Sequence, residues 1–131
     1  MNKLVFTVFA AVGLMLPLSA QPVNVDVPFE FAVGNQMAPA GRYDIRYEAG
    51  SPVLHVEGSD SGSRYATRVM ATQDVNRAPQ PKLVFHRYEN QYFLWQVWTG
   101  TLKYDLPLSR VERELKSSSV TPPQEVVLAM R

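Results

Sequence analysis

Hydrophobic residues recur at every second position over residues 23–33, and this period predicts a β-strand. The apolar positions are Val23, Val25, Val27, Phe29, Phe31 and Val33. Successive side chains of a strand point to opposite faces, so this spacing puts one apolar face inward. Pro28 has no N–H to donate to a neighbouring strand, which places this strand at a sheet edge or puts a break at Pro28.

Shorter alternating segments follow along the chain, separated by turns rich in glycine, proline and serine. We expect further strands over residues 42–48, 53–57, 64–72, 82–88, 92–98 and 125–131. About seven short strands with frequent turns are typical of an all-β, mainly antiparallel domain. The pattern leaves open whether that domain is a small β-barrel or a β-sandwich.

One segment has helical spacing instead. Leu108, Val111 and Leu115 recur at i, i+3 and i+7, which predicts a helix over residues 107–116. Pro107 suits the first turn of such a helix, because its missing N–H has no partner there in any case. This predicted helix is the amphipathic element available to cover a sheet.

The segment KLVFHRYENQYFLWQVW (residues 82–98) predicts a hairpin that is apolar on both faces. A two-residue turn at Glu89-Asn90, with positive φ at Asn90, would pair Phe85 with Leu94. One face would then carry Leu83, Phe85, Tyr92 and Leu94. The other would carry Val84, His86, Phe93, Trp95 and Val97, with Val84 opposite Trp95. We expect the helix stripe to cover this second face and to bury Trp95.

Composition supports an ordered globular protein and weakens several functional classes. The 131 residues are 46% hydrophobic and 19% charged, and 13 Lys and Arg nearly balance 12 Asp and Glu. There is no basic excess to hold a nucleic acid, so we expect no nucleic-acid partner. The chain has no cysteine, so its fold depends on packing without disulfides.

The first twenty residues have the layout of a secretory signal peptide. Lys3 precedes the apolar run 4–16, and Pro17, Ser19 and Ala20 follow it. An uncleaved membrane anchor is the alternative, but the run of 13 residues is short against the roughly 20 that cross a bilayer. We therefore expect residues 1–20 to be a signal peptide and residues 21–131 to be a single β-rich domain. That domain would be periplasmic or extracellular, with no stable membrane anchor after cleavage.

Four segments together resemble a family of small secreted bacterial proteins of unknown function, with PFxF, PAGxY, KLxFHRYGxxYFLxxVW and SxxERE motifs. The segments are VDVPFEFAVG (25–34), APAGRYDI (38–45), KLVFHRYENQYFLWQVW (82–98) and PLSRVEREL (107–115). The chain departs from the pattern at Glu89, where the family favours glycine. The resemblance implies export and a compact β domain, and it implies no activity.

The sequence contains few patterns that are typical of catalytic or metal-binding sites. No serine elbow occurs, and His55 and His86 fall on different predicted strands without a carboxylate at a telling spacing. We expect no catalytic residue, no metal site and no cofactor. His86 lies within an aromatic strand, where it is either a proton donor in a pocket or a core histidine bonded to a neighbouring group.

The pattern favours a non-enzymatic binding module for a small apolar or sugar-like ligand. Tyr88, Tyr92 and Trp98 are the candidate ligand-binding residues, because exposed aromatic rings suit such ligands. Alternatively, the same three residues belong to the periphery of the core. The alternative is a structural or assembly protein of the envelope that binds other proteins, for example by strand addition at the first strand. An enzyme is the third hypothesis and would need a cleft with converging polar groups.

Overall fold

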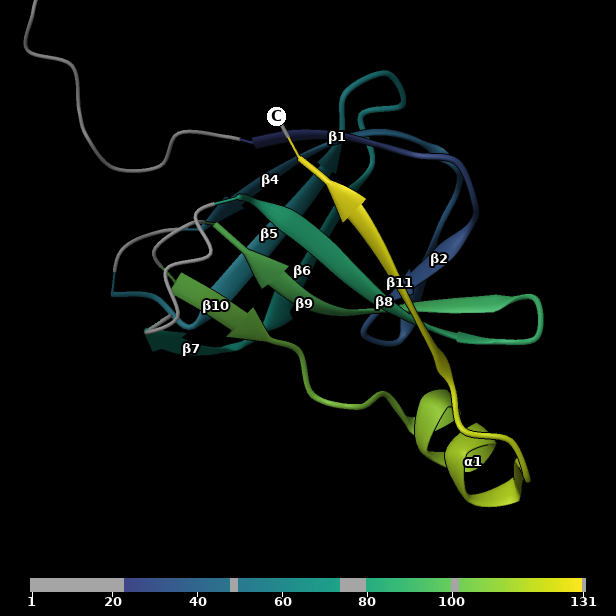
Figure 1. Ribbon diagram of the computed structural model, residues 1–131. Helices are drawn as coiled ribbons and strands as arrows, with labels where there is room; N and C mark the ends of the chain where they lie inside the picture. Colours follow the sequence, from purple (N-terminus) through teal and green to yellow (C-terminus); the bar gives the residue numbers. More distant parts are fainter. Residues whose placement is uncertain (1–22, 48–49, 74–79, 100–101, 131) are drawn as a thin grey trace, which may run out of the picture.

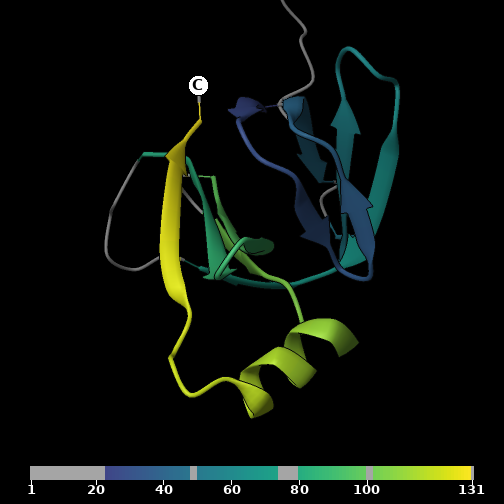
Figure 2. The same cartoon turned by 90° about the vertical axis from the view of Figure 1, so that its right-hand side faces the viewer.

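Two β-sheets pack face to face in the computed structural model of the protein, which describes residues 23–47, 50–73, 80–99 and 102–130 (Figures 1 and 2). The predicted signal peptide, residues 1–20, lies outside the described residues. None of the described segments forms a helix with the length and apolar character that crossing a bilayer requires.

The small sheet has four antiparallel strands in the order β1-β4-β5-β6. They are β1 (Val23–Val27), β4 (Gly41–Tyr47), β5 (Val53–Gly58) and β6 (Arg64–Arg68). β1 is the outer strand and ends before Pro28, so both the edge position and the break predicted from that proline are confirmed.

The large sheet has seven strands, and its main path runs β11-β8-β9-β10-β7. The strands are β2 (Phe31–Val33), β3 (Gln36–Ala38), β7 (Met70–Gln73), β8 (Lys82–Tyr88), β9 (Gln91–Trp98), β10 (Leu102–Asp105) and β11 (Gln124–Ala129). β2 pairs in parallel with β9 and antiparallel with β3, while the other pairs are antiparallel. The prediction of an all-β, mainly antiparallel fold with one helix towards the C-terminus is confirmed.

The core lies between the two sheets and is built from their inner faces. The odd-numbered residues of the 23–33 segment point into it as predicted, and Phe31 is 1% exposed. Phe85 of β8 lies at the centre, with its ring edge-to-face against Phe29 and Phe31 at centroid distances of 5.0 and 5.5 Å. Such pairs contribute beyond the apolar area that they bury.

The β8–β9 hairpin contains a register shift that the sequence pattern did not reveal. Phe85 lies opposite Leu94 as predicted, but Val84 lies opposite Gln96, so the predicted pairing of Val84 with Trp95 is wrong. Trp95 is the extra residue of this bulge. One extra residue reverses the facing of everything after it, and Val97 therefore points into the core instead of the outer face.

The hairpin turn also differs from the expectation. Glu89, rather than Asn90, has the positive φ, at 55°. A side chain is disfavoured in this left-handed region because its Cβ crowds the backbone. Glu89 is also the position at which the resembled family favours glycine.

Replacing Glu89 with glycine is therefore expected to stabilise the protein by about 0.5–1 kcal/mol, because relief at positive φ outweighs the added freedom of the unfolded chain. Urea denaturation measures this difference. Glu89→Ala is the matched control, since it removes the same carboxylate but keeps the Cβ. A glycine variant no more stable than the alanine variant would show that the turn carries no strain.

The helix α1 (Arg110–Ser118) starts later than predicted and turns a different face inward. Leu108 precedes it, and Val111 is 48% exposed, so the predicted stripe of Leu108, Val111 and Leu115 is wrong. Leu115 alone of the three packs from the helix against Ala32, Tyr88 and Phe93. Its partner on the inner face is Glu112, which is 3% exposed.

The helix thus covers only the end of the large sheet's outer face that is nearest the hairpin turn (Figures 1 and 2). Trp95, which we expected to be buried under it, is only partly buried. The helix therefore covers the second apolar face of the hairpin only near the turn. Further along, Trp95 is partly exposed, whereas Val84 is only 4% exposed.

These positions predict different effects for two helix substitutions. Val111→Asp should melt close to the wild type because its side chain already faces solvent. Leu115→Asp should lower the free energy of unfolding by roughly 2–3 kcal/mol, since it sets a carboxylate against Tyr88 and Phe93. Thermal melts of both variants check this, and equal losses would mean that α1 is seated differently.

Candidate functional site

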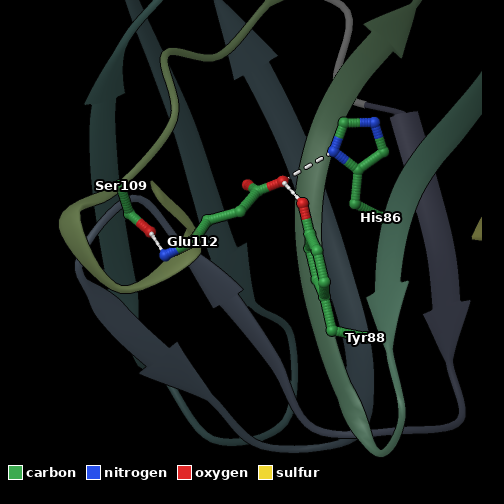
Figure 3. Close-up of polar contacts among 4 residues, drawn as sticks. All are labelled: His86, Tyr88, Ser109 and Glu112. Carbon is green, nitrogen blue, oxygen red and sulfur yellow. Dashed lines mark hydrogen bonds and ion pairs between the residues drawn. The ribbon is translucent and has the colours of Figure 1, made fainter. Parts of the chain in front are cut away.

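A buried carboxylate joins the helix to the large sheet. Glu112 of α1 points towards the outer face of β8, where Oε2 lies 2.6 Å from His86 Nδ1 and 3.1 Å from the Tyr88 hydroxyl (Figure 3). A carboxylate only accepts hydrogen bonds, so both strand residues donate to the same oxygen. His86 and Tyr88 are two positions apart and therefore share a face of the strand. We call Glu112, His86, Tyr88 and Ser109 the Glu112 cluster.

Ser109 sets the position of Glu112 by starting the helix. Its hydroxyl oxygen accepts a hydrogen bond from the Glu112 backbone N–H at 3.1 Å, as an N-cap residue does (Figure 3). The Ser-x-x-Glu spacing is that of a capping box, in which the glutamate would turn back to the cap. Here its carboxylate contacts the strand instead. Asn35 Oδ1 also accepts from the Arg110 N–H at 3.3 Å, which fastens the helix start to the β2–β3 turn.

His86 is held on two sides. Its ring stacks on Trp95 with centroids 4.1 Å apart, and its side chain is only 13% exposed. The expected bond of His86 to a neighbouring group is present in its contact with Glu112, but His86 lies on the outer face of β8 and is only partly buried. Chemically the Glu112 cluster fixes the orientation of one imidazole and one phenol and immobilises the first turn of α1.

Burial raises the pKa of the Tyr88 hydroxyl to about 12, and the charge and hydrogen bond of Glu112 act in the same direction. A phenolate next to a buried carboxylate would place two negative charges together in a poorly solvated site. The phenol therefore keeps its proton and its hydrogen bond throughout the neutral range.

This shift predicts a loss of stability in alkali. The folded-state pKa of Tyr88 lies above the ordinary value of 10.0, so the unfolded chain loses the proton first and stability falls as pH rises from about 10 to 12. Wild type should lose roughly 1 kcal/mol more than Tyr88→Phe between about pH 9 and 11. Urea denaturation across this range checks it, with Tyr65→Phe as control. Parallel curves for wild type and Tyr88→Phe would contradict the assignment.

A groove opens beside Tyr88, between the hairpin turn, the end of α1 and the segment that leads to β11. It has a volume of about 550 Å³. We call it the hairpin groove, and its lining residues are Arg87, Tyr88, Glu89, Gln91, Leu115, Ser118, Ser119, Thr121, Pro122 and Gln124. Most of these offer hydroxyl, amide or guanidinium groups. Arg87 is held over the Tyr92 ring at 5.6 Å, and its Nε donates to the Glu89 carbonyl at 2.8 Å.

The structure does not bring the three candidate ligand-binding aromatics together. Tyr88 lines the hairpin groove but is only 6% exposed, which fits the alternative that it belongs to the periphery of the core. Tyr92 lies on the opposite face of the hairpin and stacks on Phe29, with centroids 3.8 Å apart.

Trp98 lies at the far end of β9, with Lys82 Nζ and Lys103 Nζ at 4.6 and 5.5 Å from its ring centroid. Trp98 and Tyr92 both lie outside the lining of the hairpin groove. A ligand-binding role for the three residues together therefore stays a prediction.

Sequence reasoning missed Glu112 as a site residue. His86 and Glu112 are 26 positions apart, so no local spacing links them. Two signals were present. His86 and Tyr88 occur in one motif of the resembled family, and Ser109 and Glu112 in another. The Ser-x-x-Glu spacing also marked the helix start at Ser109.

No family model, curated protein or solved structure matches the chain. The resemblance to small secreted bacterial proteins therefore stays a prediction. Within the described part of the chain, no three His, Asp or Glu side chains gather closely enough to hold a metal ion.

Proposed function

We propose that the protein is an exported, non-enzymatic domain that binds a small, polar, sugar-like ligand in the hairpin groove. The observation that carries this proposal is the lining of the groove, in which hydroxyl and amide side chains surround a space of about 550 Å³. That volume lies within the range of small-molecule sites.

The chemistry of the lining favours a sugar-like ligand over an apolar one. Gln91 and Gln124 each carry both donors and acceptors, and Thr121 adds a hydroxyl group. The Ser118 and Ser119 hydroxyls donate to backbone carbonyls and can still accept. Sugar hydroxyls also donate and accept, so they can satisfy such groups. Leu115 and Pro122 are the aliphatic residues of the lining, and apolar atoms make up about as much of the lining as polar atoms do. An apolar ligand would desolvate the side chains of Gln91, Gln124 and Thr121 without offering them hydrogen-bond partners, which is costly.

The Glu112 cluster keeps one wall of the groove in place before a ligand arrives. Its two hydrogen bonds and the Ser109 cap anchor α1, and Tyr88 belongs to both the cluster and the groove. A preformed wall avoids the entropic cost of ordering the site during binding.

Titration of the isotope-labelled protein with glucose, N-acetylglucosamine and cellobiose tests this function by NMR. At least one sugar should shift the amide signals of residues that line the groove. The double variant Gln91→Ala, Gln124→Ala should bind about tenfold more weakly, since it loses two hydrogen-bonding groups. Gln36→Ala is the matched control, because Gln36 is an exposed glutamine of β3 outside the groove. Sugar-induced shifts that persist in the double variant would place the ligand elsewhere.

Export is supported by the N-terminal pattern of a charged residue, a short apolar run and small residues at its end. N-terminal sequencing of the protein recovered from the cell envelope or medium should find the chain without residues 1–20. A chain that still begins at Met1 would contradict cleavage.

One observation favours the alternative role in envelope assembly. β1 is the outer strand of the small sheet, and among the described strands it pairs on one side only, with β4. Its free backbone groups could accept a strand from another protein. Pro28 limits that template to the five residues of β1. Cross-linking in the envelope that captures one defined protein through β1, with no sugar binding, would favour assembly.

A further inference from the structure

The outer face of the small sheet is hollowed around Ala66. The hollow has a volume of about 450 Å³ and is lined by Arg46, Tyr47, His55, Glu57, Arg64, Tyr65 and Ala66. These residues come from the three adjacent strands β4, β5 and β6. We call it the Ala66 hollow. It shares no lining residue with the hairpin groove.

The hollow exists because one short side chain lies among long ones. Arg46, His55 and Ala66 occupy one row across the three strands, since Arg46 pairs with His55 and His55 pairs with Ala66. The next row on the same face contains Asp44, Glu57 and Arg64, since Glu57 pairs with both of the others. Asp44 lies outside the lining of the hollow. The methyl group of Ala66 therefore forms a low floor, and the side chains around it form the rim.

The rim carries an excess of positive charge. Two arginines, Arg46 and Arg64, face one carboxylate, Glu57. Arg46 Nη2 lies 2.5 Å from Glu57 Oε1, which orients the Arg46 guanidinium while its remaining N–H groups can bind other acceptors. Arg64 is exposed and offers a second planar fork of donors. The two arginines and Glu57 give the lining one net positive charge, and Asp44, beside Glu57 but outside the lining, offsets part of it.

The polar groups around the hollow favour a ligand that carries hydroxyl groups as well as a carboxylate. Guanidinium groups match the two oxygens of a carboxylate in a bidentate contact. The negative charge of Glu57 repels a ligand that carries several negative charges. Its carboxylate can accept hydrogen bonds from hydroxyl groups of a ligand. His55 adds a further polar group beside the floor. A monocarboxylate that also carries hydroxyl groups satisfies both the arginines and Glu57.

We propose that the Ala66 hollow is a binding site for a hydroxylated monocarboxylate of the sugar-acid class. Its carboxylate contacts Arg64 and Arg46, and its hydroxyl groups face Glu57 and His55. The site is independent of the sugar-like ligand proposed for the hairpin groove.

An NMR titration of the labelled protein with D-glucuronate at low ionic strength tests the proposal, with D-glucose as the neutral comparison. Glucuronate should shift the amide signals of β4, β5 and β6 around Ala66, and glucose should leave them unchanged. Arg64→Ala should weaken glucuronate binding about tenfold, the size expected for one lost charge-assisted contact. Arg113→Ala, an exposed arginine of α1, is the matched control and should bind like wild type.

A second variant tests whether binding needs the shape of the hollow as well as its charged residues. Ala66→Leu fills the floor of the hollow but keeps every charged group, so it should abolish the glucuronate shifts. Retained binding in Ala66→Leu, or equal loss in Arg64→Ala and Arg113→Ala, would overturn the proposal. Equal shifts with inorganic phosphate and glucuronate would also overturn it, because the site would then recognise charge alone. The Gln91→Ala, Gln124→Ala variant should bind glucuronate at the hollow normally, which separates this test from that of the hairpin groove.

Discussion

Replacing Glu112 with alanine is expected to lower the free energy of unfolding by about 3–5 kcal/mol, because two buried donors would each lose their acceptor at a cost of about 1–3 kcal/mol. The variant would leave the His86 Nδ1–H and the Tyr88 hydroxyl without their shared acceptor. Both groups lie where water has little access, since Tyr88 is 6% exposed and the His86 side chain 13%. Urea denaturation at neutral pH measures the loss, and we expect α1 to detach before the sheets unfold.

Two further variants make this result specific to the buried carboxylate. Glu114→Ala removes an exposed glutamate from the same helix and should change stability by less than about 0.5 kcal/mol. Glu112→Gln keeps an oxygen that can accept from Tyr88 but loses the charge, so its stability should lie between those of wild type and Glu112→Ala. Equal stabilities of Glu112→Ala and Glu114→Ala would show that the helix is not held by Glu112.

Replacing Phe85 with alanine is the second substitution with a large expected effect. Phe85 is fully buried between the sheets and contacts the rings of Phe29 and Phe31. Truncation of a buried phenylalanine costs about 3–5 kcal/mol, through lost burial and the cavity left behind. That is a large share of the roughly 5–15 kcal/mol that stabilises a typical domain. We expect a melting temperature far below that of wild type, or no cooperative transition.

Trp95→Ala is the informative comparison from the same hairpin. The sequence pattern alone ranked Trp95 as a core residue, but it lies at the bulge and is only partly buried. It should destabilise the protein less than Phe85→Ala, mainly through lost stacking on His86. A melting temperature lower for Trp95→Ala than for Phe85→Ala would mean that the outer face is packed more tightly than the structure shows.

The strands could be predicted because their signal is local. Alternation over residues 23–33 identified the inward side chains of β1 and β2, and Pro28 identified the break between them. The hairpin over residues 82–98 was recognisable from its composition and its central turn. Alternation cannot locate an inserted residue when both faces are apolar, so the bulge at Trp95 and the inward turn of Val97 escaped prediction.

The helix was likewise predicted only as far as neighbouring residues determine it. Its existence followed from apolar residues at helical spacing, but its inner face did not. Hydrophobicity suggested that Val111 is covered, whereas Glu112 is the buried residue. A glutamate in a helix sequence normally predicts a solvent-exposed position, because burying its charge without partners is costly. The partners that offset this cost, His86 and Tyr88, lie on a strand far back in the sequence.

The sequence by itself determined the all-β class, the edge break at Pro28, the hairpin and the presence of a helix near the C-terminus. Each of these depends on neighbouring residues, through strand or helix periodicity and the geometry of proline. Only the tertiary structure decided the sites. The Glu112 cluster, the hairpin groove and the Ala66 hollow each combine side chains from separate strands or from a strand and the helix. Such contacts depend on register and on how elements pack, which local periodicity does not contain.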